Sequence, residues 1–281
     1  MTERVIGRPE APEPLPAPVV DNHCHLEIQL DGTTELGVAD ALAAATDVGV
    51  PRIVQIGCEL DSARWSVGVA EQHDRIVAGV ALHPNEAPRL AAAGTFEETW
   101  AEIETLAAHP RVRAVGETGL DFFRTPDEGL AAQEHSFRRH IDLAKRLGKT
   151  LVIHDRDAHA DILRVMDDEG APERVVMHCF SGDAEFARRC LARGWWLSFA
   201  GTVTFKNAGY LRDALVVAPR DRVLVETDAP FLTPAPYRGR PNASYLVPLT
   251  MRAMAEVRED DLAALCGAVE ANTYAAFGGA W

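Results

Sequence analysis

Eight short runs of β-branched or apolar residues alternate with longer amphipathic segments from Val19 onward. This alternation predicts parallel strands joined by crossover helices. We expect strands over residues 18–23, 51–57, 76–81, 112–117, 150–154, 174–178, 195–199 and 222–226. We expect helices over residues 35–48, 62–73, 95–108, 129–147, 158–169, 183–193, 208–217, 246–257 and 260–275. Eight strand–helix units in order are typical of a (β/α)8 TIM barrel, an α/β fold of roughly 250 residues that would occupy residues 19–281 as a single unit.

The first eighteen residues differ from the rest because they contain five prolines and almost no long apolar side chains. They lack the apolar core of a secretory signal, and we expect residues 1–18 to form a Pro-rich flexible leader that the barrel does not need. No apolar run approaches the roughly 18 residues that a transmembrane helix requires. We therefore expect a soluble protein with no membrane partner.

The cysteines and the net charge limit the compartment and the function class. Five cysteines, an odd number without CxxC spacing, suit a reducing compartment better than a disulfide framework, so the cytoplasm is expected. A formal net charge of −14 disfavours a passive nucleic-acid binder, because long-range attraction to phosphate needs a basic surface. It is compatible with an enzyme whose bound divalent cations supply positive charge at the site.

Two imidazoles, those of His23 and His25, stand two residues apart at the end of the first expected strand. Since side chains alternate along a strand, both should point to the same face, and Cys24 between them should point away. Alone, such a pair fits ordinary polar residues as well as it fits a metal site. The other strand ends decide between these interpretations.

Side chains that bind metals also end four other expected strands. Glu117 ends the fourth, His154 the fifth and His178 the sixth, while Glu226 and Asp228 end the eighth. In a barrel these ends converge on one mouth, where catalytic residues collect. Divalent cations such as Zn²⁺, Mg²⁺ or Mn²⁺ bind this mixture of neutral imidazole and carboxylate. The sequence therefore predicts a metal centre formed by His23, His25, Glu117, His154, His178 and Asp228.

Six short segments identify a family resemblance. In chain order they are DNHCHL at 21–26, LHP at 82–84, GETGLD at 116–121, IHDR at 153–156, HCFSG at 178–182 and ETDAP at 226–230. Together they resemble the TatD-type deoxyribonucleases of the amidohydrolase superfamily, and the resemblance extends from residue 19 to about 277. The chain departs from the family's usual Asn-Glu-Pro or Asn-Gln-Pro stretch, because Asn242 is followed by Ala243 and Ser244. That departure concerns substrate contacts of the loop rather than the metal site.

The resemblance implies a centre for two divalent metal ions. His23 and His25 would hold one ion, and His154 and His178 would hold the second. Glu117 would bridge the two, at the position where other amidohydrolase branches use a carboxylated lysine. The identity of the metal is left open by this pattern of ligands.

The attacking water needs a base, and the eighth strand offers two carboxylates. Two cations about 3.5–4 Å apart would ionise a bridging water near neutral pH and polarise a phosphoryl oxygen. Asp228, which by resemblance also binds metal, would accept the proton, because four histidines are already used as ligands. We expect Glu226 to orient a ligand or a metal-bound water.

Two further residues are candidates for substrate binding. Arg156, two residues beyond His154, can grip a phosphate with two hydrogen bonds, although a solvated loop arginine fits the sequence equally well. His83, before Pro84, ends the third strand, where an exposed loop imidazole is the alternative. The resemblance implies instead that His83 contacts the phosphate of the substrate.

The expected function is hydrolysis of phosphodiester bonds in DNA, with exonucleolytic action on single-stranded ends. Without a broad basic track the enzyme should hold only a few nucleotides of its nucleic-acid substrate. One alternative is an amidohydrolase-type esterase or amidase, including removal of an aminoacyl group from tRNA. A second is a non-catalytic metal-binding protein, which an open coordination position would argue against. No obligate protein partner is evident in the sequence.

Overall fold

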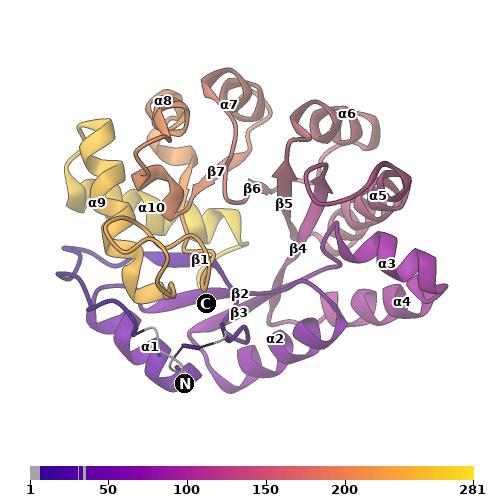
Figure 1. The fold of residues 1–281 in the computed structure, drawn as a ribbon, viewed down its shortest axis with the longest axis horizontal. Helices are drawn as coiled ribbons and strands as arrows, with labels where there is room; N and C mark the ends of the chain where they lie inside the picture. The colour runs from indigo at the N-terminus through magenta and orange to yellow at the C-terminus, as the bar shows by residue number, and fades with distance from the viewer. Residues whose placement is uncertain (1–6, 31, 34–35) are drawn as a thin grey trace. The chain divides into compact units, whose positions relative to one another are not determined.

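The computed structural model describes residues 7–30, 32–33 and 36–281, and Figure 1 labels its elements along the chain. Its eight strands are β1 (Val20–Cys24), β2 (Arg52–Gly57), β3 (Ile76–Val80), β4 (Val112–Asp121), β5 (Thr150–Arg156), β6 (Val175–Met177), β7 (Trp196–Phe199) and β8 (Val223–Val225). They form one sheet in the order β1 to β8. The strand pairs β3–β4, β4–β5, β5–β6 and β7–β8 are parallel. The expected TIM barrel is confirmed.

Helices separate the strands along the chain. The α-helices are α1 (Val38–Asp47), α2 (Leu60–Gln72), α3 (Glu86–Ala93), α4 (Phe96–Ala107), α5 (Leu130–Leu147), α6 (His159–Glu169), α7 (Ala184–Leu191), α8 (Gly209–Val217), α9 (Val247–Arg258) and α10 (Leu262–Ala276). Short 3₁₀ helices are η1 (Asp127–Gly129), η2 (Gly201–Thr204), η3 (Arg220–Arg222) and η4 (Ser244–Leu246). The sequence predicted every α-helix except α3. Among the helices of the described ranges, none has the length and apolar character needed to cross a membrane.

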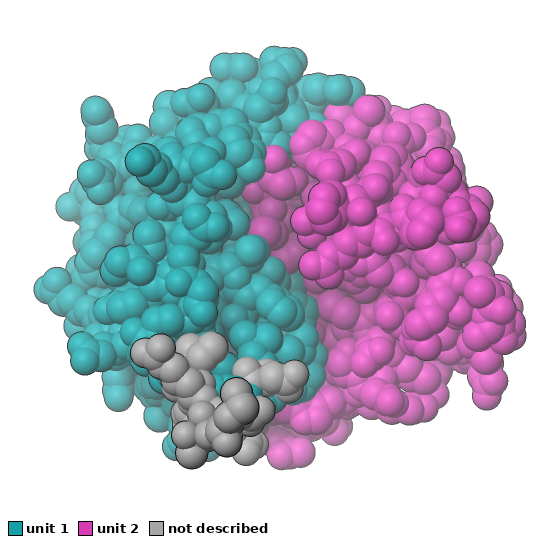
Figure 2. All heavy atoms as spheres, viewed as in Figure 1, with its two compact units in different colours: residues 1–54, 182–193, 197–273 teal, residues 55–181, 194–196, 274–281 magenta. Residues whose placement is uncertain are grey.

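The chain divides into two compact units, coloured separately in Figure 2. Unit 1 comprises Met1–Val54, Gly182–Arg193 and Leu197–Thr273, and unit 2 comprises Gln55–Ser181, Gly194–Trp196 and Tyr274–Trp281. Every residue of β1, β3 and β8 is buried. Strands buried on both faces have near-continuous apolar sequences, as in β3 (IVAGV) and β8 (VLV), whereas β1 (VDNHC) carries buried polar side chains.

β4 and β5 approach each other unusually closely within unit 2. Their register pairs Gly119 with His154 and Asp121 with Arg156. A Cβ built on Gly119 would lie 2.0 Å from the backbone oxygen of His154, and the φ of Gly119 is 143°. Only glycine adopts this conformation and leaves room for the neighbouring strand. β4 therefore continues past Glu117 to Asp121, four residues beyond the expected end.

The expected flexible leader comprised residues 1–18, of which residues 1–6 lie outside the described ranges. Residues 7–18 are instead held by burial and hydrogen bonds. The side chain of Leu15 is 8% exposed, and its N–H donates to the carbonyl oxygen of Val48 at 3.0 Å. The Tyr245 hydroxyl donates to the carbonyl oxygen of Pro9 at 2.7 Å. Proline lacks an N–H but keeps its carbonyl acceptor, so a Pro-rich segment can still be held by hydrogen bonds. Composition alone concealed this packing.

Candidate metal centre

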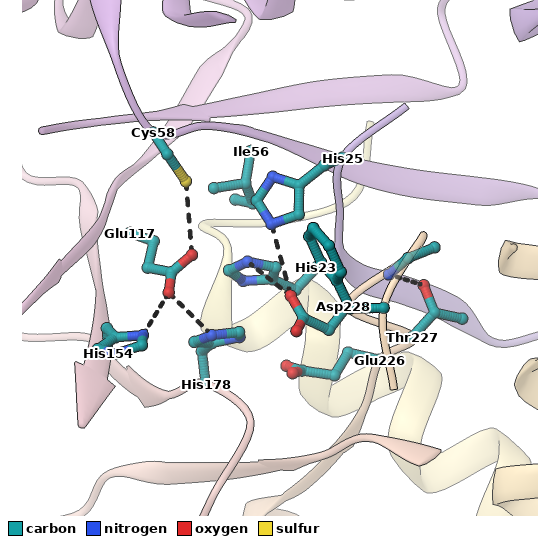
Figure 3. A network of polar contacts seen from close by, with 12 residues as sticks. His23, His25, Ile56, Cys58, Glu117, His154, His178, Glu226, Thr227 and Asp228 are labelled. Carbon is teal, nitrogen blue, oxygen red and sulfur yellow. Dashed lines mark hydrogen bonds and ion pairs between the residues drawn. The ribbon is translucent and has the colours of Figure 1, made fainter. Parts of the chain in front are cut away.

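The His-x-His pair lies in unit 1, and both imidazoles point at one carboxylate. The exposed fractions of His23 and His25 are 0% and 6%. Their Nε2 atoms lie 3.8 and 3.4 Å from Oδ1 of Asp228, as Figure 3 shows. The two rings meet edge to face, with centroids 5.1 Å apart. Three potential ligands from opposite ends of the chain thus gather beside β1.

The backbone fixes this arrangement. The N–H of Asp228 donates to the carbonyl oxygen of His23 at 2.9 Å, and the N–H of His25 donates to that of Ala229 at 2.8 Å. Cys24 and Ala229 form a parallel bridge that extends the pairing beyond β8. Asp228 has a φ of 54°, in the left-handed region that aspartate tolerates better than most residues. Its side chain keeps 16% of its surface exposed, which makes it reachable by water.

A second carboxylate, that of Asp21, joins β1 to the segment after β8. It accepts hydrogen bonds from the N–H of Thr227 at 2.9 Å and from the Thr227 hydroxyl at 2.6 Å. Burial raises the pKa of Asp21 to about 6 against the opposing effect of these hydrogen bonds. Asp21 begins the DNHCHL motif, but no role for its side chain was evident from the sequence. The structure shows that this side chain holds the loop that carries Asp228.

Glu226 is fully buried and is held from one side by a short polar chain. The Asn22 side-chain amide donates to the Ser198 hydroxyl at 2.8 Å and to the carbonyl oxygen of Val225 at 2.5 Å. The Ser198 hydroxyl in turn donates to Oε2 of Glu226 at 2.5 Å. A buried carboxylate needs such partners, and an oxygen of Glu226 also lies within 4.8 Å of a ring nitrogen of His23, so Glu226 could help to hold a cation.

Glu117 is the centre of the second set, which lies in unit 2. Its Oε1 lies 2.6 Å from Nδ1 of His154, 3.1 Å from Nε2 of His178 and 3.5 Å from Nε2 of His83. Its Oε2 is 3.5 Å from the sulfur of Cys58, and Figure 3 shows the sulfur and the imidazoles of His154 and His178 converging on the carboxylate. Glu117 is only 4% exposed. One carboxylate therefore faces three ring nitrogens in a buried position.

The electrostatics of this set keep the carboxylate of Glu117 ionised. Burial alone would raise the pKa of Glu117, but the charges of His178 and His83 and the hydrogen bond from His154 outweigh it and hold the pKa well below its usual range. Burial lowers the pKa of His154, yet its hydrogen bonds to Asp121 and Glu117 raise it to about 9. Ligand atoms of His83, Glu117 and His154 lie within 4.8 Å of one another. An ionised carboxylate among imidazoles is the donor set that borderline divalent ions bind.

Asp121 was missed as a site residue by sequence reasoning. Its Oδ2 lies 3.3 Å from Nε2 of His154, the ring nitrogen opposite the one that faces Glu117. Metal-binding histidines commonly donate their second ring N–H to a carboxylate, which fixes the ring orientation. Glu117 and Asp121 are four residues apart on one strand, a spacing that puts both on the same face and that could have identified Asp121.

The predicted site residues lie in both units. His83, Arg156, Glu117, His154 and His178 lie in unit 2, and His23, His25, Glu226 and Asp228 lie in unit 1. The Arg156 guanidinium carbon lies 4.0 Å from the centroid of the Phe123 ring.

The altered loop beyond β8 has a structural role in unit 1. The Asn242 side-chain amide donates to the carbonyl oxygens of Thr227 at 2.9 Å and Phe231 at 2.6 Å. Asn242 is 1% exposed, and Ala243 and Ser244 are buried as well. These three residues thus pack into the unit and hold the segment that contains Asp228.

Comparisons of sequence and of structure with known proteins match the same family. A family model described as TatD related DNase matches residues 20–278. An uncharacterized metal-dependent hydrolase named TatD from Mycobacterium tuberculosis is 44% identical over 272 residues, covering 94% of this chain and 99% of that protein. A Cronobacter sakazakii protein named 3'-5' ssDNA/RNA exonuclease TatD is 34% identical over 243 residues, covering 83% of this chain and 89% of that protein. The crystal structure of YjjV, a TatD homolog from Escherichia coli, aligns with a TM-score of 0.81 at 26% identity, covering 93% of this chain and 98% of the other.

Proposed function

This chain is a metal-dependent hydrolase that belongs to the family of TatD-related DNases, and from that premise we propose that it hydrolyses phosphodiester bonds at single-stranded DNA ends. The observation that carries the proposal is the buried Glu117 carboxylate within 3.5 Å of three imidazole nitrogens. The name of the Cronobacter relative, an exonuclease on single-stranded DNA and RNA, supports this substrate class.

We propose that two divalent cations bind the six ligands predicted from the sequence. Five of the six lie within three residues of the carboxyl end of a barrel strand, and Glu117 lies on β4 four residues before its end. The cations supply Lewis acidity for the phosphoryl group and positive charge for the transition state. The proposed ligands are His23, His25, Asp228, Glu117, His154 and His178.

Each remaining residue has a distinct proposed task. Asp228 accepts the proton of the attacking water, because its carboxylate is partly exposed and lies 3.4 Å from the imidazole of His25. His83, whose side chain is 18% exposed, faces a phosphate oxygen together with Arg156. Glu226 cannot reach a substrate because it is fully buried, so it supports the set in unit 1 through Ser198.

We also propose the cytoplasm as the compartment and short nucleic-acid ends as the binding partner. The five cysteines, all of them among the described residues, form no disulfide, which suits a reducing environment. The net charge of −14 favours a short contact near the metals over a long track along the strand.

The proposal is tested by metal analysis combined with turnover of three substrates under the same metal and salt. These are a single-stranded oligonucleotide, a blunt duplex of the same sequence and a phosphate-free aminoacyl ester. We expect metal-dependent cleavage that is fastest for the single strand and slower for the duplex. The ester should be hydrolysed very little. Ester hydrolysis without phosphodiester cleavage would establish the amidohydrolase alternative, and bound metal without any turnover would establish a non-catalytic role.

Arg156→Ala tests the phosphate contact. Loss of a charged hydrogen bond, about 1.5–3 kcal/mol, should slow oligonucleotide cleavage roughly tenfold to a hundredfold and affect the ester much less. Arg188→Ala is the matched control, because that arginine is 58% exposed on α7 and pairs only weakly with Glu185 at 3.6 Å. Equal losses on all substrates for Arg156→Ala would mean that the arginine supports the fold of the site instead.

A further inference from the structure

We propose that Phe123 and Arg156 form a stacking subsite for a nucleobase of the substrate strand, an inference that rests on the proposed function. At 64% exposed, Phe123 is the most exposed large hydrophobic side chain of the described residues. Such an exposure leaves most of the aromatic surface in contact with solvent. Phe123 lies two residues beyond the end of β4, and its ring is covered by Arg156, the last residue of β5.

The Phe123 ring and the Arg156 guanidinium form two layers, which together we call the platform. The Arg156 guanidinium carbon lies 4.0 Å from the Phe123 ring centroid, which is cation–π stacking distance. The guanidinium therefore covers part of the ring, and the large remaining exposure leaves aromatic surface open to solvent. Guanidinium and phenyl groups both stack on bases, and the guanidinium can also donate to a phosphate.

Hydrogen bonds connect the platform to the set around Glu117. One oxygen of Asp121 lies 3.3 Å from Nε2 of His154, and the other accepts the N–H of Phe123 at 3.0 Å and of Arg124 at 2.8 Å. The N–H of Phe122 donates to the carbonyl oxygen of Arg156 at 2.9 Å, which continues the β4–β5 ladder into the turn. One buried carboxylate thus orients both a proposed metal ligand and the turn that presents the ring.

Strand geometry sets the distance from the metal ligand to the platform. Arg156 is two residues beyond His154 on β5, on the same face, which is an advance of about 7 Å. Stacked nucleotides advance about 3.4 Å each along a strand. A base on the platform therefore belongs to a nucleotide one or two steps from the scissile phosphate.

A base fits this surface better than a protein partner does. The platform is one ring with one cation, whereas specific protein interfaces bury about 800 Å² on each partner. Stacking also holds a single strand regardless of its sequence and needs few basic residues, which agrees with the net charge of −14.

The test compares a single-stranded oligonucleotide with the same oligonucleotide made abasic at its two terminal nucleotides. The wild-type protein should cleave the base-bearing strand about tenfold faster, as expected for losing one stacked base. Phe123→Ala should slow cleavage of the base-bearing strand about tenfold and leave the abasic strand unchanged, while Phe123→Trp should retain the preference. Trp65→Ala, which removes an aromatic side chain 36% exposed on α2, is the control and should change neither rate.

A binding measurement separates failure of the subsite from failure of the proposed function. Stacking of 2-aminopurine placed at the strand end should quench its fluorescence with the wild-type protein and not with Phe123→Ala. Equal cleavage of both strands by wild type, or equal slowing of both by Phe123→Ala, would overturn the subsite while phosphodiester hydrolysis stands. Quenching that depends on Phe123 in a protein that cleaves neither strand would keep the subsite and refute the proposed function. Absence of both quenching and cleavage would refute both.

Discussion

A drop in pH should destabilise this protein through His140, an imidazole that belongs to neither proposed ligand set. His140 is fully buried in α5. Its Nε2 accepts the N–H of Leu82 at 3.1 Å, and its Nδ1 donates to the carbonyl oxygen of Ser136 at 2.7 Å. These two hydrogen bonds require the neutral ring, with its proton on Nδ1. The ring thereby holds the backbone just before His83.

The magnitude follows from the pKa of this ring. Burial lowers the pKa of His140 from 6.5 to about 3, with a further contribution from the positive charge of Arg139. Because the folded pKa is depressed, the unfolded chain takes up a proton first as the pH falls. The stability is therefore complete above pH 6.5 and is lost between about 6.5 and 3. At 1.36 kcal/mol for each pH unit, the loss is about 3 kcal/mol at pH 4.5 and about 5 kcal/mol near pH 3.

The assay is urea unfolding of wild type and His140→Gln at half-unit steps from pH 7.5 to 4.5. At pH 7.5 the variant should be less stable by about 1–3 kcal/mol, since a glutamine amide does not reproduce both the packing of the buried ring and its two hydrogen bonds. The gap should narrow as the pH falls, because only the wild type loses the contribution of the neutral ring. His135→Gln, which removes an exposed imidazole from the same helix, controls for surface effects. A gap that stays constant across the pH range would refute the assignment of a neutral buried ring.

Four other substitutions test the site and the leader. Glu117→Ala should lower both metal content and turnover, because the carboxylate is a proposed ligand and the centre of the set in unit 2; two retained metals at full rate would contradict this. Asp228→Asn should retain metal by elemental analysis yet lose more than about a hundredfold in rate, as expected for a general base, and a near-normal rate would exclude that role. Asp121→Asn should weaken metal affinity about tenfold to a hundredfold in a chelator competition. Unchanged affinity would show that Nε2 of His154 does not need the carboxylate of Asp121. Leu15→Ala should lower the free energy of unfolding by about 2 kcal/mol, and no change in urea would restore the interpretation of a loose leader.

The sequence predicted the fold because barrel strands are apolar on both faces and their helices are amphipathic. The missed helix α3 shows where that reasoning stops. Glu86–Ala93 is only eight residues long and contains Pro88, so the segment resembles a loop. Proline is tolerated there because the first turn of a helix has N–H groups without helical partners. The continuation of β4 past Glu117 was concealed by Gly119, whose role depends on the proximity of β5.

The ligands and their supports differ in how far the sequence reveals them. A histidine or glutamate at a strand end is recognisable by its own chemistry, so five of the six proposed ligands were predicted from residue type and position. The choice of Asp228 over Glu226 depended on the family resemblance. Asp121 has no such signature, because its role is defined by the second nitrogen of His154, which is 33 positions away in the chain. Asp21 likewise depends on Thr227. Asp121 nevertheless keeps even spacing from Glu117, a proposed ligand on its own strand. Period-two spacing puts such a carboxylate on the face that carries the ligand, so in a barrel strand an acid two or four residues from a ligand is a candidate support even when its partner is unknown.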